Sequence, residues 1–150
     1  MNRINIFSVE KPDGRLDVGQ ALGSSGLLMF MYDIAPGASS SPYHYEYDEE
    51  WLLVVDGTVV LRAPDGEHTL ERGDLVCFPR GPAGAHKVMN RSESPARTLL
   101  FSRVGAGFAV SVYPDSDTIG VFAGDDNDLV FERGTAVPWA HGEEGWNKAT

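Results

Sequence analysis

Two histidines and two glutamates have the types and the spacing of a metal-binding site. His44 and Glu46 lie two residues apart in a segment expected to be extended, so both side chains leave the same face of the chain. Glu50 opens the next apolar run, and His86 opens a later run after a glycine-rich turn. Two imidazoles and two carboxylates that converge from three strands suit Fe, Mn, Co, Ni or Zn, and suit calcium poorly. We therefore predict one divalent transition-metal ion, of unresolved identity, held by His44, Glu46, Glu50 and His86.

Two other interpretations of these residues stay open. In the first, both histidines are hydrogen-bonded interior residues and the glutamates are solvated at a rim, which leaves no metal site. In the second, Glu46 points away, and two histidines with one carboxylate form a facial triad, still a competent metal site. No general base stands out beyond the ligands themselves, so catalytic residues stay unassigned.

Aromatic and basic side chains near these positions have both a binding and a structural interpretation. Four aromatic residues either line a pocket for an aromatic or sugar-like ligand or simply pack the fold: Tyr43, Tyr45, Tyr47 and Trp51. Three arginines either clamp a carboxylate or phosphate with the guanidinium fork or form surface salt bridges: Arg62, Arg80 and Arg103.

Strand-length segments between glycines and prolines must position these side chains. They are rich in β-branched and aromatic residues and predict strands over 27–34, 50–55, 58–62, 74–78, 85–89, 98–103 and 108–113, with an edge strand at 119–122. No window shows a convincing helical repeat. Many short strands with turns between them indicate an all-β sandwich or barrel.

Two turns predict how neighbouring strands connect. Asp56-Gly57 separates two apolar runs, and glycine accepts the positive φ of a tight turn, so these runs are expected to pair as a hairpin. Pro64-Asp65-Gly66 repeats that chemistry one strand later. Together the turns predict an antiparallel meander.

Length, charge and cysteine content restrict the class of protein. The 150 residues suffice for one domain over 1–150, with its core at about 27–113, N-terminal strands and a C-terminal extension. A formal net charge of -10 makes nucleic acid a poor partner, because phosphate binding needs clustered Lys and Arg. No apolar stretch reaches the ~20 residues of a membrane span and no secretory signal is visible, so no membrane partner and a cytoplasmic location are expected. The single Cys77 is expected to be a small buried residue.

Two motifs around the candidate ligands resemble those of the cupin family. Residues 37–57 carry Gly37, His44-Tyr45-Glu46, Glu50 and Gly57, similar to a first cupin motif of glycine, His-x-His, Glu and glycine. Residues 73–90 are similar to the second motif through Gly73, Pro79-Arg80-Gly81, His86 and Asn90. The resemblance implies a double-stranded β-helix, a jelly-roll barrel with the metal inside its open end. It assigns ligands to His44, Glu50 and His86, with position 46 as the fourth.

The sequence departs from the cupin pattern at that fourth position. Glu46 stands where the family usually has a second histidine, so the site would hold two His and two Glu. Two glutamates neutralise a dication, which makes the ion a milder Lewis acid and favours harder ions such as Mn or Fe(II). A longer turn, Pro82-Ala83-Gly84-Ala85, precedes His86 and is expected to enlarge the loop at the barrel mouth.

The resemblance leaves several functions open, because one fold hosts many. Cupins similar to this chain include isomerases, epimerases, dioxygenases and plain binding domains. We expect a metal-binding protein that acts on or binds a small metabolite, as a dioxygenase or a sugar isomerase or epimerase; whether it is an enzyme stays open. The alternative is a non-catalytic protein that binds or senses a small molecule. Flat apolar strands outside the barrel also predict a homodimer.

Overall fold

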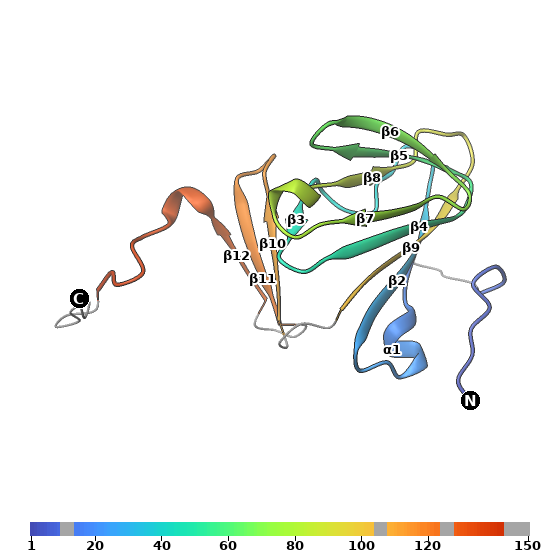
Figure 1. Cartoon of the computed structure of the whole chain (residues 1–150), viewed down its shortest axis with the longest axis horizontal. Coiled ribbons are helices and arrows are strands. Elements are labelled where there is room, and N and C mark those ends of the chain that lie inside the picture. The colour runs from blue at the N-terminus through green and yellow to red at the C-terminus, as the bar shows by residue number, and fades with distance from the viewer. Residues whose placement is uncertain (10–13, 104–107, 124–127, 143–150) are drawn as a thin grey trace.

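The computed structural model is a jelly-roll barrel built mainly of short strands, and it describes residues 1–9, 14–103, 108–123 and 128–142 (Figure 1). The strands are β1 (Arg15–Asp17), β2 (Leu27–Ile34), β3 (Tyr45–Glu46), β4 (Glu50–Asp56), β5 (Thr58–Ala63), β6 (Gly66–Glu71), β7 (Leu75–Phe78), β8 (Lys87–Met89), β9 (Ala96–Arg103), β10 (Ala109–Tyr113), β11 (Thr118–Phe122) and β12 (Leu129–Glu132). The helical segments are α1 (Val18–Leu22) and the 3-10 turns η1 (Pro82–Gly84) and η2 (Arg133–Thr135). Among the described residues, none of these helices has the length and apolarity to span a bilayer.

The strands form three antiparallel sheets. One has the order β1-β2-β9-β4-β7, a second β6-β5-β8, and a third β12-β11-β10-β3. In Figure 1 the second sheet lies over the first, and the third stands at one end of the barrel. The predicted all-β class and jelly-roll barrel are therefore confirmed.

The connection at Asp56-Gly57 differs from the predicted hairpin. Strand β4 pairs with β7 and β9, whereas β5 pairs with β6 and β8, so the turn carries the chain from one sheet to the facing one. Gly57 has φ 77°, and a Cβ there would lie 3.0 Å from the Cα of Ala96. A tight-turn signal is local, and it cannot tell a hairpin from a corner between sheets. The predicted meander is wrong here, while the hairpin at Pro64-Asp65-Gly66 is confirmed because Ala63 pairs with Gly66.

Three smaller predictions also need correction. Strand β11, predicted at an edge, lies between β10 and β12. A short helix, α1, occurs where none was predicted, and the Asp17 side chain caps it by accepting a hydrogen bond from the Gln20 backbone N–H at 2.8 Å. Cys77 is exposed, because alternation along β7 turns its neighbours Val76 and Phe78 toward the barrel interior and Cys77 outward.

Apolar side chains cover both faces of the five-stranded sheet. Alternate residues of β4 separate the two clusters: Leu52 and Val54 face the barrel interior, while Leu53 and Val55 face outward. The interior cluster also takes residues from the facing sheet, and the outer cluster is covered by the N-terminal segment and α1. Each fully buried Leu or Val contributes about 1.5–3 kcal/mol. The five-stranded sheet is thus packed with hydrocarbon on both faces.

Candidate metal centre

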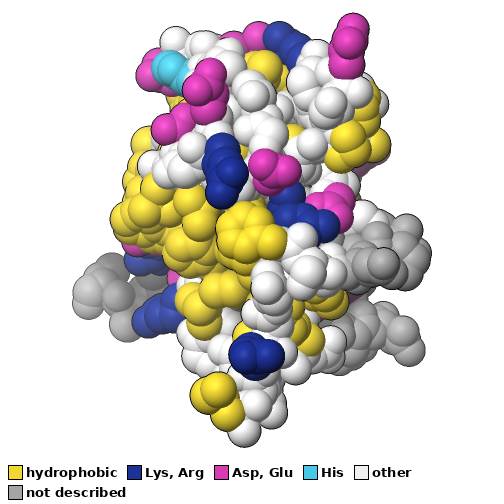
Figure 2. All heavy atoms as spheres, turned by 90° about the vertical axis from the view of Figure 1, so that its right-hand side faces the viewer, with side chains coloured by type: hydrophobic (Ala, Val, Ile, Leu, Met, Phe, Trp, Pro, Cys, Tyr) yellow, Lys and Arg dark blue, Asp and Glu magenta, His cyan; other side chains and the backbone are white. Residues whose placement is uncertain are grey.

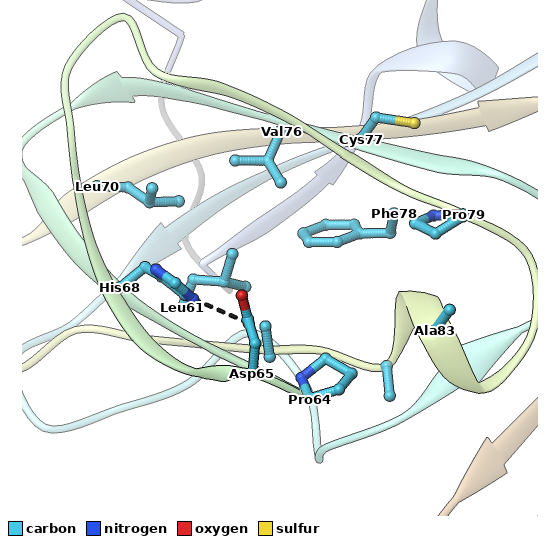
Figure 3. Close-up of a pocket in the computed structure, with 12 residues that line it drawn as sticks. Leu61, Pro64, Asp65, His68, Leu70, Val76, Cys77, Phe78, Pro79 and Ala83 are labelled. Atoms are coloured by element: carbon cyan, nitrogen blue, oxygen red, sulfur yellow. Dashed lines mark hydrogen bonds and ion pairs between the residues drawn. The ribbon is translucent and has the colours of Figure 1, made fainter.

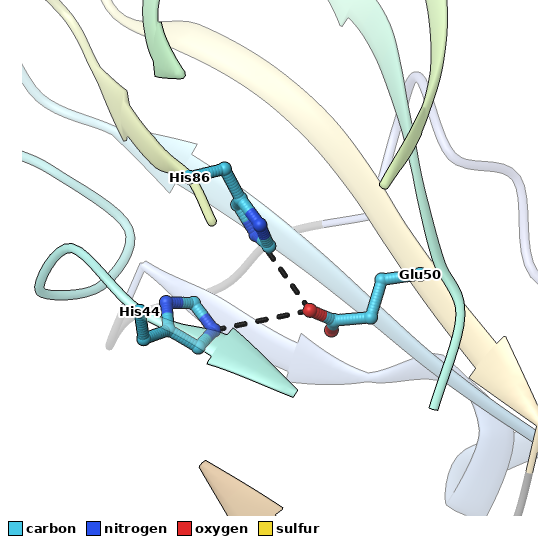
Figure 4. A group of neighbouring side chains, drawn as sticks. All are labelled: His44, Glu50 and His86. Carbon is cyan, nitrogen blue, oxygen red and sulfur yellow. Dashed lines mark ion pairs between the residues drawn. The ribbon is translucent and has the colours of Figure 1, made fainter. Parts of the chain in front are cut away.

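Three of the four predicted ligands meet inside the barrel (Figure 4). Glu50 Oε2 lies 3.9 Å from His44 Nε2 and 3.7 Å from His86 Nε2. One ligand atom from each residue falls within 4.8 Å of the others. Two imidazole nitrogens and one carboxylate oxygen around a common point form the donor set of a transition-metal site.

Backbone hydrogen bonds hold the two histidines opposite each other. The His44 N–H donates to the His86 carbonyl at 3.0 Å, and the His86 N–H donates to the His44 carbonyl at 2.7 Å. Glu50 opens β4, where it pairs with Phe78 on one side and Ser102 on the other. Glu50 is therefore placed by a regular strand, and the two histidines are placed by an isolated antiparallel bridge just before β3 and β8, which favours a defined geometry.

Each imidazole is oriented by a backbone carbonyl on its far side. His44 Nδ1 lies 3.0 Å from the Pro42 carbonyl, and His86 Nδ1 lies 2.9 Å from the Gly84 carbonyl. A protonated Nδ1 that donates to a carbonyl leaves Nε2 with a free lone pair, which is how metal-ligating histidines are usually held. His86 Nε2 is buried and has no hydrogen-bond partner among the residues that the structure describes. A bound cation would satisfy that atom, so the residues fit a metal ion.

The surroundings of the cluster disfavour charge on its own groups. Glu50 is 5% exposed, and burial, together with the charge of Glu46, raises its pKa to about 8. His86 is fully buried, and burial, together with the neighbouring His44, lowers its pKa to about 4. A bound dication would favour the ionised form of Glu50, because its positive charge stabilises the carboxylate. It would also bind the neutral form of the imidazole, which burial already favours at His86.

Glu46 lies on the wall of a cavity that His44 and Glu50 also line. It is not part of the three-residue cluster found among the described residues. Its Oε1 accepts a hydrogen bond of 2.7 Å from the Ser111 hydroxyl across the β3–β10 pair. Its effect on the pKa of Glu50 places the two carboxylates within electrostatic range. The predicted alternation holds, because His44 and Glu46 both face the cavity while Tyr45 packs against Ala85 and Val112.

A cavity of about 640 Å³ opens beside the cluster. Its wall includes aromatic and hydroxyl side chains from β2, β9, β10 and β11, and its acidic side chains come from other segments of the chain. Tyr32 and Tyr113 are two wall residues that our sequence interpretation did not single out. Burial raises the pKa of Tyr32 above its ordinary value, the Arg15 charge opposes this rise, and the charges of Glu50 and Glu46 add to it. Tyr32 lies on the same face of β2 as Leu28 and Phe30, because every second residue of a strand points to the same side. This spacing could have identified Tyr32 from the sequence.

Of the two interpretations of the four aromatic residues, the pocket interpretation does not hold for the cavity beside the cluster. Among the described residues of the cavity wall, none of Tyr43, Tyr45, Tyr47 and Trp51 occurs. Tyr43 lies under the Arg62 guanidinium at 3.9 Å, and Trp51 stacks on Phe101 with ring centres 6.5 Å apart. Tyr43 and Trp51 therefore have the packing role of the two that were considered.

The three arginines divide between the two roles considered for them. Arg62 makes a bidentate salt bridge to Asp115 at 2.6 and 2.9 Å, and Arg80 donates to the Tyr47 carbonyl. Arg103 lines the cavity. The surface interpretation holds for Arg62, and a ligand-binding role stays open only where the guanidinium faces the cavity.

Phe78, which contacts His86, also lines an apolar pocket of about 540 Å³ together with residues that include Leu61 and Val76 (Figure 3). The Phe78 ring stacks on the His86 ring at 3.7 Å with an interplanar angle of 6°. Phe78 thus forms a hydrocarbon wall that fixes the imidazole and shields it from this pocket.

Comparison with known proteins agrees with the fold and with both motifs. Residues 30–102 match the family model of the cupin domain. This chain belongs to the cupin superfamily. The structure of a sugar phosphate isomerase of the cupin superfamily from Silicibacter pomeroyi is 27% identical, with a TM-score of 0.77 over 89% of this chain and 94% of that one. A putative sugar phosphate isomerase from Acidithiobacillus ferrooxidans has the same fold, with 22% identity and a TM-score of 0.73 over 83% and 78% of the two chains.

One curated protein also matches this cupin. It is the tetracenomycin polyketide synthase protein TcmJ of Streptomyces glaucescens, 27% identical over 80 residues. The match covers 53% of this chain and 52% of that protein, so the cupin spans about half the length of this relative.

Proposed function

We propose that this cupin binds one divalent transition-metal ion and uses it to bind and transform a small metabolite in the adjoining cavity. The observation that carries the proposal is the convergence of His44, Glu50 and His86 on one point, with the buried Nε2 of His86 lacking any other partner in the described part of the chain. The cavity of about 640 Å³ is of the size that holds a small-molecule ligand.

His44, Glu50 and His86 would hold the ion, with Glu46 as the proposed fourth ligand. Glu46 lies on the same wall, and Ser111 orients its carboxylate through one oxygen. Two carboxylates would balance a dication, so the centre would be close to neutral. The identity of the metal remains open among Fe, Mn, Zn and Ni, with harder ions favoured by the second glutamate.

The metal would polarise a substrate oxygen and thereby lower the barrier to moving a neighbouring proton. The chain itself provides a phenol on the cavity wall near a proposed ligand, Tyr113, whose ring centre lies 5.9 Å from that of His44. A phenol beside a carboxylate can hold or deliver a proton without being a metal ligand. Ser102 and Ser111 add hydroxyl groups that can orient a polar substrate.

Isomerisation or epimerisation of a sugar-like molecule is the reaction class that we favour over dioxygenation. The Silicibacter pomeroyi protein, whose structure is named a sugar phosphate isomerase, aligns over nearly its whole length. Proton donors placed beside a polarising metal suit proton shuttling at a carbon next to a carbonyl.

A second candidate is an aromatic ligand, bound with or without turnover. Phe30, Phe108 and Phe122 lie on the cavity wall with the two tyrosines, and aromatic rings accept a planar ligand by stacking. The partial match to a polyketide synthase protein is in keeping with this option. Binding without turnover would make the protein a sensor or storage module.

The test begins with metal content and continues with turnover. Protein purified without chelator is expected to contain about one equivalent of a transition metal per chain by inductively coupled plasma mass spectrometry. The loaded protein is then assayed by proton exchange in D₂O with aldoses, ketoses and their phosphates, and by oxygen uptake with catechols and flavonols. Exchange supports the isomerase and oxygen uptake the dioxygenase. Metal-loaded protein that binds members of either panel without converting them would support the sensor, and a protein that takes up no metal would refute the proposal.

The expected partner and compartment belong to the same proposal. We propose a homodimer, because β12 at the edge of its sheet exposes Leu129, Val130 and Phe131. Figure 2 shows Lys and Arg side chains at separate places on the face drawn. We propose no nucleic-acid partner, because the formal net charge of -10 opposes binding to phosphates. A cytoplasmic location remains a prediction.

A further inference from the structure

Two guanidinium groups line the cavity that is also lined by His44 and Glu50 of the proposed metal site. Arg15 comes from β1, and Arg103 ends β9. Five register positions separate them along β2, where Arg15 pairs with Tyr32 and Arg103 pairs with Leu27. They therefore occupy different parts of the wall and cannot be assumed to grip the same group.

Arg15 is held by an aromatic ring rather than by an acid. Its guanidinium carbon lies 4.1 Å from the centre of the Phe30 ring, and Phe30 is itself a wall residue. Within the described part of the chain, no ion pair involves Arg15. Stacking on a ring uses the face of the guanidinium and leaves its N–H edge available to an oxyanion.

Three other arginines already use their guanidinium N–H groups to bind a carboxylate. Arg62, Arg91 and Arg97 each contact both oxygens of a carboxylate at 2.6 to 2.9 Å. Arg103 is intermediate, because it lies 3.8 Å from Asp48, too far for a hydrogen bond, with a side chain that is 79% exposed. Arg15 is thus the cavity arginine that is both oriented and available.

Tyr32 adds a second donor beside Arg15. The two residues are direct neighbours across the β1–β2 pair, and both line the cavity. A guanidinium edge and a phenol hydroxyl offer three hydrogen-bond donors to one carboxylate or phosphate group. Arg15 and Tyr32 line the same cavity as His44 and Glu50, so a small molecule held by this donor pair is in the space that the proposed metal ligands border.

The charges around the cavity indicate that Arg15 and Tyr32, rather than the proposed metal centre, would recognise an acidic group. The two glutamates neutralise a bound dication, so the proposed metal centre has little net attraction for an anion. Of the other acidic wall residues, Asp128 accepts a hydrogen bond of 2.7 Å from the Ala123 backbone, and Asp48 lies beside Arg103. On a chain of formal charge -10, an anionic ligand needs a specific positive contact to enter.

We propose that Arg15 and Tyr32 bind the acidic group of the substrate, so that this cupin selects a small carboxylate or phosphate ester whose other end reaches the metal. The inference rests on the proposed function and names its substrate class. Arg15 is a specificity-determining residue in this scheme, and Arg103 has a weaker role near Asp48.

The test compares acidic probes with neutral partners of the same shape on the full chain loaded with Mn²⁺. The probe pairs are glucose 6-phosphate with glucose, and 4-hydroxybenzoate with 4-hydroxybenzamide, titrated by isothermal calorimetry. At least one acidic probe is expected to bind ten times more tightly than its neutral partner. R15Q is expected to weaken acid binding about ten- to a hundredfold, the usual range for a lost charged hydrogen bond, and to leave neutral binding unchanged. Y32F is expected to weaken acid binding severalfold and R103Q less.

Arg72→Gln is the matched control, because this guanidinium also lies over a phenyl ring, Phe7 at 5.8 Å, but away from the cavity wall. Metal content is measured on every variant and is expected to be unchanged in R15Q. The inference is overturned if acidic and neutral partners bind equally, if no acidic probe binds the metal-loaded chain, or if R15Q behaves like R72Q. A wild-type chain that takes up no metal refutes the proposed function instead. R15Q must then still reduce acid binding to the metal-free chain, or the inference fails as well.

Discussion

Replacing Glu50 with Gln is expected to stabilise the metal-free protein and to abolish its response to metal. The carboxyl is buried, and its pKa is raised from 4.5 to about 8 by burial and by the charge of Glu46. A raised folded-state pKa means that stability is fully present below pH 4.5 and is lost as the pH rises through about 8. A neutral amide of the same shape avoids that loss.

The size of the effect follows from the shift. A pH of 7 is about 2.5 units above the pKa of the carboxyl in the unfolded chain, whereas the carboxyl in the folded chain remains mostly protonated. This difference lowers the free energy of unfolding by roughly 3 kcal/mol, at 1.36 kcal/mol per unit. At pH 5 the same reasoning gives about 1 kcal/mol. For a chain of this size, these values correspond to a Tm raised by roughly 6–12 °C at pH 7 and roughly 2–4 °C at pH 5. The lowered pKa of His86 acts on both proteins and cancels in the comparison.

Differential scanning calorimetry in the presence of EDTA, at pH 5 and pH 7, measures the difference in Tm between the metal-free variant and the metal-free wild type. The second quantity is the rise in Tm that Mn²⁺ or Zn²⁺ produces, expected in the wild type and lost in the variant, because a ligand that binds only the folded state adds RT ln(1 + [L]/Kd). Glu93→Gln, at an exposed position, is the control and should change neither quantity. A gain in Tm that is equal at pH 5 and pH 7, or a variant that melts below the wild type at pH 7, would refute the argument that a buried charge is the cause.

Three further predictions test the surroundings of the site. His86→Gln should reduce bound metal well below one equivalent in elemental analysis while the barrel still folds, and full metal content would contradict the assignment of this ligand. Phe78→Ala should lower the free energy of unfolding by about 3–5 kcal/mol in urea titrations and weaken metal binding, since the ring fills the core and supports the imidazole; a loss below about 1 kcal/mol would show that the stack is unimportant. The wild type should elute as a dimer of 16.3 kDa chains in light scattering, and Val130→Glu, at a position 62% exposed on β12, should shift it toward the monomer. A monomeric wild type at working concentration would exclude the dimer.

Local patterns were enough to predict most of the strands and the residues around which the site forms, although β1, β6 and β12 fall outside the predicted segments. The spacing of His44 and Glu46 placed both on one face, because successive residues of an extended chain point to opposite sides. Strand β2 coincides with the predicted segment 27–34, where β-branched and aromatic residues run between turn signals. The two motifs also indicated the cupin barrel, since their glycines, histidines and glutamate occur in the order and spacing of that family.

The tertiary structure decided which strands are neighbours and what surrounds each charge. No local signal showed that Asp56-Gly57 is a corner between facing sheets, because a glycine turn serves a hairpin and a corner equally well. The pKa values of Glu50 and His86 depend on burial by segments far away in the sequence. Arg15 reaches the cavity only because β1 pairs with β2, and pairing between distant strands is a property of the folded chain as a whole.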